Sequence, residues 1–212
     1  MSRAIKNVIA IEAAIVGGSI SLLRDGQETA NWIGEADVLK AENLLVNIDM
    51  LLRDNEVDRR EIDLVAVSAG PGSFTGIRVG IATALGLKNG LNIDMSSVSA
   101  LEAMASDLHV PSNRLTAAVP VGRNAVCVEE FDLSGDRPRS IYGPKAIPRE
   151  ELMDLVGGEP TVSYVLHEFL YALCKPSDVA INFGRNIAAA IGRICSGRPV
   201  AVTDPLFISK GF

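Results

Sequence analysis

The chain has 212 residues, of which 48% are hydrophobic, and a formal net charge of −6 at pH 7. This length and composition suffice for one folded domain or two small ones, and they exclude a disordered chain. The acidic balance and the lack of clustered Lys and Arg argue against a strong nucleic-acid footprint, so we expect any RNA contact to be made through a partner. The three cysteines are widely spaced and odd in number, which indicates reduced thiols and excludes a disulfide framework.

No stretch approaches the roughly 20 apolar residues that are needed to cross a bilayer. The apolar run near the N-terminus is brief and contains Glu12, so it predicts a strand and not a signal peptide. We therefore expect a cytoplasmic protein that makes no contact with a membrane.

The first half of the chain alternates between the period of a strand and that of a helix, and an Asp-Gly hairpin signal stands at residues 25–26. The expected elements are strands at 5–14, 19–24 and 28–33, a helix at 36–53, a strand at 62–67, a helix at 76–87, a strand at 91–95 and a helix at 97–105. Three opening strands followed by this alternation predict an α/β fold, a mixed sheet with covering helices.

The second half follows a polar break near residues 106–114. Its expected elements are paired strands at 115–119 and 125–131, helices at 148–156 and 177–195, and an extended segment at 205–208. The break predicts two units, 1–106 and a smaller 107–212, and the hairpin-like start of both halves is weak support for a duplicated unit.

A glycine-rich loop at residues 70–73 joins an apolar strand to a helix that either Ser73 or Thr75 can cap. Its spacing fits neither a P-loop nor a dinucleotide fingerprint. Two interpretations stay open. One is a structural turn that lets the helix press against the sheet. The other is contact with an anion or nucleotide by Gly70, Gly72 and Ser73, together with Glu12 at the end of the first strand.

Small residues recur every four positions after this loop, at Gly76, Gly80 and Ala84, so they share one helix face. Each helical glycine costs about 1 kcal/mol relative to alanine, so a close backbone approach is expected there. The approaching element is either the chain's own sheet or a helix of another subunit. The second interpretation predicts a partner interface of Leu45, Ile48, Leu52, Gly76, Gly80, Thr83, Ala84 and Leu87.

The sequence offers few candidate residues for catalysis or metal binding. The only histidines, His109 and His167, stand far apart, and no metal-ligand spacing is present, so we predict no catalytic residue, no metal and no cofactor. Glu12 stands where a sugar kinase or actin-like ATPase holds an acid for magnesium. This position leaves one alternative open, an actin-like ATPase or small-molecule kinase that uses Glu12 and the loop from Gly70 to Gly76.

The segment from Ser68 to Gly80 resembles the signature of the bacterial TsaB (YeaZ) family. Further resemblance to that family lies at residues 8–12, 44–52, 82–87, 97–103 and 205–208. The resemblance implies an actin-like ATPase fold of the sugar kinase/Hsp70 type, with two related subdomains of which the second is reduced. Two segments differ from the family pattern, Glu12-Ala13-Ala14 in place of Asp-Thr-Ser and Pro120 to Arg123 in place of Asp-Ala-Arg.

The resemblance also implies a function, that of a non-catalytic subunit of the machinery that makes threonylcarbamoyladenosine in tRNA. The family's catalytic paralogue TsaD transfers the threonylcarbamoyl group to the adenosine beside the anticodon, and the ATPase TsaE joins the TsaB–TsaD pair. We therefore expect a heterodimer with a TsaD-type protein, a homodimer when that partner is missing, and tRNA contact only through the complex.

Overall fold

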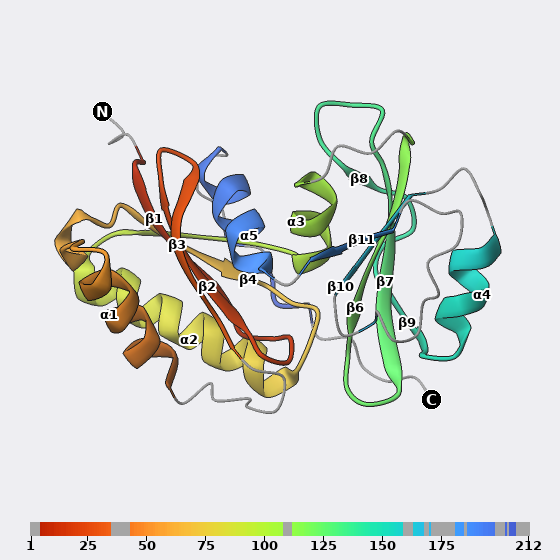
Figure 1. Ribbon diagram of the computed structural model, residues 1–212, viewed down its shortest axis with the longest axis horizontal. Helices are drawn as coiled ribbons and strands as arrows, with labels where there is room; N and C mark the ends of the chain where they lie inside the picture. The colour runs from red at the N-terminus through yellow and green to blue at the C-terminus, as the bar shows by residue number, and fades with distance from the viewer. Residues whose placement is uncertain are drawn as a thin grey trace.

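The computed structural model describes residues 5–34, 43–107, 112–158, 163–167, 170, 181–184, 186–197, 202 and 204–206. Its main features are two β-sheets that stand side by side, each with helices on its faces (Figure 1). The order of strands and helices confirms the predicted α/β class.

The first sheet is mixed and has the order β3-β2-β1-β4-β5. Its strands are β1 (Asn7–Glu12), β2 (Ser19–Arg24), β3 (Gln27–Ile33), β4 (Leu64–Ser68) and β5 (Asp94–Val98). Strand β1 pairs antiparallel with β2 and parallel with β4, and β4 pairs parallel with β5. The predicted hairpin forms at Asp25 and Gly26, whose positive φ values of 51° and 77° suit a turn between two twisted strands.

Helices cover both faces of this sheet. The outer face carries α1 (Leu44–Asp54) and α2 (Phe74–Leu91), and the inner face carries α5 (Ile187–Ser196), against which α3 (Ala100–Ser106) packs. Because successive strand residues point to opposite faces, Ile9 and Ile11 of β1 join the outer core with α1, while Val8 and Ala10 join the inner core with α5. The sheet is thus buried on both sides, as the long apolar runs of its strands require.

The second sheet has the order β11-β10-β6-β7-β8, and β9 also pairs with β7. Its strands are β6 (Arg114–Pro120), β7 (Ala125–Asp132), β8 (Arg139–Ser140), β9 (Lys145–Pro148), β10 (Ser163–His167) and β11 (Ile181–Gly184). Helix α4 (Glu151–Gly158) contacts β9, and α3 lies between α5 and strands β6 and β7.

The structure corrects the prediction of one helix at 177–195. Residues 181–184 form β11, parallel to β10, and α5 begins at Ile187, where the Asn186 Oδ1 accepts a hydrogen bond of 3.3 Å from the Ala189 N–H. The periodicity of four apolar residues does not distinguish a strand from a helix, so pairing with a neighbouring strand determines which of the two forms. The strand expected at 91–95 lies at 94–98 instead, because α2 continues to Leu91. Residues 36–42, 177–180 and 207–208 of the predicted elements lie outside the described residues.

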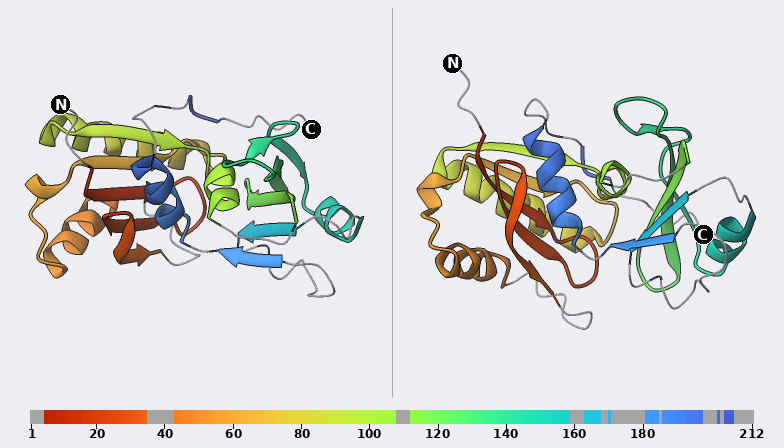
Figure 2. Two further views of the ribbon diagram at one scale, coloured as in Figure 1. Left: turned by 90° about the horizontal axis from the view of Figure 1, so that it is seen from above. Right: turned by 45° about the horizontal axis from the view of Figure 1, so that its top comes forward.

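Helix α5 comes from the second half of the chain but packs over β1, β2 and β4 of the first sheet, as the three views agree (Figures 1 and 2). One apolar core runs from β1 through α3 and α5 to β6 and β7. Division of the chain into units at residues 106 and 107 stays a prediction, and the helix at 187–196 contributes to the core of the first unit.

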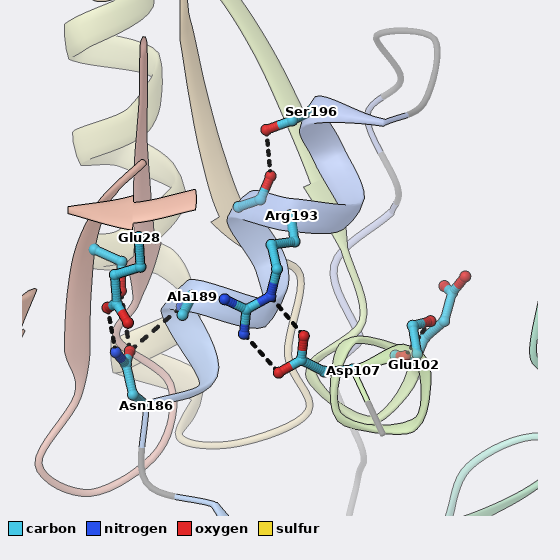
Figure 3. Close-up of polar contacts among 10 residues, drawn as sticks. Glu28, Glu102, Asp107, Asn186, Ala189, Arg193 and Ser196 are labelled. Carbon is cyan, nitrogen blue, oxygen red and sulfur yellow. Dashed lines mark hydrogen bonds and ion pairs between the residues drawn. The ribbon is translucent and has the colours of Figure 1, made fainter. Parts of the chain in front are cut away.

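Polar contacts hold α5 next to both places where the chain crosses between the sheets (Figure 3). Arg193 donates to Asp107, at the end of α3, through two contacts of 2.6 Å, and this pairing raises the pKa of Arg193. Asn186, just after β11, donates to Glu28 of β3 at 2.5 Å. None of the helices in the described ranges is long and apolar enough to span a membrane.

Candidate functional site

The first candidate site is the edge of the first sheet where the parallel strands β1 and β4 end, at Glu12 and Ser68. In α/β folds, ligands bind at the carboxyl ends of such strands. The structure brings the predicted Glu12 and the glycine loop together there. The Ser73 N–H donates to the Ala14 carbonyl at 2.6 Å, and a Cβ added to Gly72 would lie 2.4 Å from that same oxygen.

The Glu12 carboxyl group is turned back onto its own chain. Its Oε1 accepts hydrogen bonds from the N–H groups of Ala14 at 2.7 Å and Ile15 at 3.1 Å, and its side chain is 2% exposed. Burial raises the pKa of Glu12 to about 7, against the lowering effect of these two bonds. Glu12 ends a strand, but it is a buried carboxyl group and not a surface acid. The carboxylate itself occupies the place that a bound anion would take beside two adjacent backbone N–H groups.

The glycine loop also uses its backbone donors within the chain. The Gly70 N–H donates to the Ser68 Oγ at 3.1 Å, and the Gly76 N–H donates to the Ser73 Oγ at 3.3 Å, which confirms Ser73 as the cap of α2. The Gly70 carbonyl accepts from Ala100 at 2.8 Å. These bonds favour the structural turn, and contact of Glu12, Gly70, Gly72 and Ser73 with an anion or nucleotide stays a prediction.

The stripe of Gly76, Gly80 and Ala84 packs against the chain's own first sheet. A Cβ added to Gly76 would lie 2.1 Å from the Ala13 carbonyl oxygen, and one added to Gly80 would lie 3.4 Å from the Ala13 Cβ. Ala84 is fully buried in the outer core. The prediction that these three residues form a groove for another subunit is therefore wrong. The close approach exists, but its partner is the turn after β1.

A second pair of small residues, Gly86 and Gly90, lies on the exposed side of α2, and nothing lies within 4 Å of a Cβ added to either. Both glycines line a groove of about 630 Å³ between α1, α2 and the 3-10 helix η2 (Arg59–Glu61). The groove is lined by Leu45, Ile48, Asp49, Leu52, Arg59, Arg60, Gly86, Leu87, Gly90 and Leu91.

Four predicted interface residues line this groove, namely Leu45, Ile48, Leu52 and Leu87. Thr83 is half-buried on α2 and does not belong to the lining. Gly86 and Gly90 are not among the predicted interface residues, although their four-residue spacing is the same as that of the buried stripe.

Exposed apolar side chains gather on the same two helices. Among the described residues, five of the eight exposed large hydrophobics lie on α1 or α2. They are Leu45, Val46, Met50, Phe74 and Leu85. Of these five, Leu45 lines the groove, and apolar side chains exposed on two neighbouring helices are typical of a protein–protein contact.

Groups for metal or nucleophilic chemistry do not converge in the described part of the chain, where no cluster of three or more His, Cys, Asp or Glu side chains could hold a metal ion. The Cys127 thiol is buried, and its burial raises its pKa to about 12, so it stays protonated at neutral pH. His109 lies outside the described residues, and the structure gives His167 a place in β10.

Comparison with known proteins gives three related findings. A family model described as "TsaD: tRNA N6-adenosine threonylcarbamoyltransferase" matches residues 35–194. The tRNA threonylcarbamoyladenosine biosynthesis protein TsaB of Haemophilus influenzae is 33% identical over 140 residues, which cover 64% of this chain and 57% of that protein. The solved structure of YeaZ from Pseudomonas aeruginosa superposes with a TM-score of 0.67, at 22% identity, and covers 91% of each chain.

A more distant solved structure shares the fold. The activator of the 2-hydroxyisocaproyl-CoA dehydratase from Clostridium difficile, solved with bound ADPNP, has a TM-score of 0.56 at 10% identity, over 90% of this chain and 94% of that one. These superpositions confirm the actin-like ATPase fold that the sequence resemblance implies. The chain spans about half the length of the curated relatives it matches, since the first three are covered over 57%, 56% and 44% of their own lengths.

Proposed function

The chain belongs to the tRNA N6-adenosine threonylcarbamoyltransferase (TsaD) family, and from this premise we propose that it is a non-catalytic subunit of the machinery that makes threonylcarbamoyladenosine in tRNA. In this role it pairs with and activates a TsaD-type catalytic paralogue and helps to recruit a TsaE-type ATPase. It acts in the cytoplasm and reaches tRNA only through that complex. The name of its curated relatives, tRNA threonylcarbamoyladenosine biosynthesis protein TsaB, supports the pathway.

The observation that carries the proposal is the outer face of α1 and α2. A groove of about 630 Å³ lies there, and five exposed apolar side chains lie on the same two helices, which already cover one face of the sheet. Exposure of apolar surface to water is unfavourable, and burial against another apolar surface lowers the free energy by roughly 25 cal/mol per Å² of apolar area. We therefore place the pairing surface on this groove, with Leu45 and Leu87 on its walls and Ile48 and Leu52 in its floor.

The first sheet edge supports the non-catalytic part of the proposal. The Glu12 carboxyl group holds the turn after β1, and three donors of the glycine loop are satisfied by the chain itself. A nucleotide phosphate at this place would have to displace a buried carboxylate from its two hydrogen bonds. The contacts therefore favour a supporting role for this edge.

A glycine-to-leucine change in the groove tests the pairing. Gly86→Leu places a bulky side chain in open space, so the isolated chain keeps its fold while the groove is blocked. We expect the variant to lose co-purification with the TsaD-type paralogue of the same genome and to lose stimulation of tRNA modification. Gly135→Leu, at an exposed loop position beyond β7, is the matched control and should pair like the unchanged chain.

Two results would contradict the proposal. One is Gly86→Leu pairing and stimulating as well as the control does. The other is micromolar binding of ATP and magnesium in calorimetry that Glu12→Ala removes, which would instead support the ATPase or kinase alternative. Sedimentation of the chain alone shows whether the same surface forms a homodimer, which Gly86→Leu should also disrupt.

A further inference from the structure

The groove between α1 and α2 has one strongly charged end, formed by Arg59 and Arg60 of η2. We infer that this end recognises carboxylate groups on the docking partner, so that the occupant is an amphipathic helix with large apolar residues over the glycines of α2 and Asp or Glu over the two arginines. The inference rests on the proposed function, because it names the chemistry of the partner at that same surface.

The two arginines stand on a fixed support. The Asp58 Oδ1 accepts a hydrogen bond of 2.8 Å from the Arg60 N–H and so caps η2. Ile62, which follows η2 directly, is 1% exposed and belongs to the outer core. The backbone that carries Arg59 and Arg60 is therefore anchored at both ends, which reduces the entropy lost when their side chains meet a partner.

Neither arginine has an ion-pair partner among the residues that the structure describes. Other arginines of the chain do have one, since Arg53 pairs with Asp49 at 2.7 Å, Arg193 pairs with Asp107 at 2.6 Å and Arg114 pairs with Glu130. Asp58 and Glu61 flank the two arginines in the sequence but do not belong to the groove lining, where the one acid, Asp49, is paired with Arg53, so the lining itself carries an excess of positive charge. A guanidinium group matches the planar geometry of a carboxylate, so acidic residues suit this site best.

The part of the groove that α2 forms suits a large apolar side chain instead of a charged one. At Gly86 and Gly90 the backbone of α2 is uncovered, and each glycine costs the helix about 1 kcal/mol relative to alanine. Leu87 and Leu91 lie beside them in the lining. A large apolar side chain of a partner helix can therefore reach the α2 backbone here and fill the groove, as small residues allow in close helix packing.

A second copy of this chain fits the charged end less well than a partner with free acids. The carboxylate of the groove lining, Asp49, is already paired with Arg53 on the same helix. The apolar wall accepts any large side chain, so it does not discriminate between occupants. The two arginines do discriminate between occupants, because like charges and unpaired charges at an interface make the free energy of binding less favourable.

The test is a charge reversal at the groove, measured as the dissociation constant with the purified TsaD-type paralogue at low and high salt. Arg59→Glu with Arg60→Glu should weaken binding at least about tenfold at low salt and should reverse the salt dependence, because salt screens an attraction in the unchanged chain and a repulsion in the variant. Arg123→Glu with Arg137→Glu, two exposed arginines of the second half, is the matched control and should change binding less than about twofold.

The two groove variants together distinguish a failure of this inference from a failure of the proposed function. If Gly86→Leu abolishes pairing while the charge reversal matches its control, the groove binds the paralogue but the carboxylate inference is wrong. If neither variant changes pairing, the proposed function of the groove is itself wrong. If the charge reversal strengthens self-association of the chain and leaves paralogue binding unchanged, the occupant is a second copy and the inference is again overturned.

Discussion

Helix α2 carries two stripes of small residues, and the structure gives them opposite environments. Gly76 and Gly80 face the turn after β1, where a Cβ added to Gly76 would lie 2.1 Å from a backbone oxygen. Gly86 and Gly90 face outward, where nothing lies within 4 Å of an added Cβ. The same four-residue spacing therefore serves contact within the chain at Gly76 and Gly80 and leaves the helix backbone uncovered at Gly86 and Gly90.

This difference shows what a small-residue stripe can and cannot indicate. Its spacing predicts a close backbone approach, because glycine in a helix costs free energy that some contact must offset, and the chain itself supplies that approach at Gly76 but not at Gly86 or Gly90. It does not identify which element approaches. On the buried face the approaching element is Ala13, which belongs to a turn that two bonds to Glu12 hold in place.

The largest expected effect is on the buried stripe. Gly76→Ala puts a methyl group against the Ala13 backbone, which cannot move away as a flexible side chain would, so we expect the free energy of unfolding to fall by about 3 kcal/mol or more. Urea denaturation measures this loss. Gly80→Ala is the matched control, since its nearest contact would be 3.4 Å from a side-chain methyl, and it should cost far less. Equal effects of the two changes would contradict the assigned packing.

The next effect concerns the turn that the buried stripe packs against. The pKa of Glu12 is about 7 in the folded chain and near 4.5 in the unfolded one, so the folded chain binds the proton more tightly between these values. The free energy of unfolding should therefore fall as pH rises from about 4.5 to about 7, by about 3 kcal/mol from this group, and change little from it at higher pH.

Glu12→Gln removes this titration while its amide oxygen can still accept the two hydrogen bonds. Chemical denaturation at several pH values should show a shallower slope for the variant than for the unchanged chain across that window. Since Glu129 is also buried and its pKa is also raised, only the difference between the two chains reports on Glu12. Identical slopes would show that Glu12 is not the buried, weakly acidic group described above.

Much of the fold could be predicted from the sequence because its signals are local. Apolar runs, the Asp25–Gly26 turn and the cap signal before α2 locate most strands of the first sheet and the helix that follows β4. Strands β10 and β11 could not be predicted, because a strand of four or five residues carries little pattern of its own and depends on the partner beside it.

The candidate site was predictable only in part, for a related reason. Leu45, Ile48, Leu52 and Leu87 follow the helical period and line one groove, and their role in a partner interface stays a prediction. The orientation of α2 depends on long-range packing of Gly76 against Ala13, and no local pattern encodes that contact. Burial of Glu12 was missed because the sequence does not show that its own turn supplies two donors.

The smallest expected effect lies on the exposed stripe and has opposite signs for folding and for pairing. Gly86→Ala and Gly90→Ala add methyl groups in open space within a helix, so each should raise the free energy of unfolding of the isolated chain by about 0.5 to 1 kcal/mol. Both should weaken binding of the TsaD-type paralogue, though less than Gly86→Leu does, because a methyl group only narrows the groove. Urea denaturation and a binding titration on the same variants measure the two effects. If these changes stabilise the chain and pairing stays as before, the uncovered backbone of α2 has no role in docking. If they stabilise the chain and weaken pairing, the two glycines lower the stability of the isolated chain but strengthen binding of the partner.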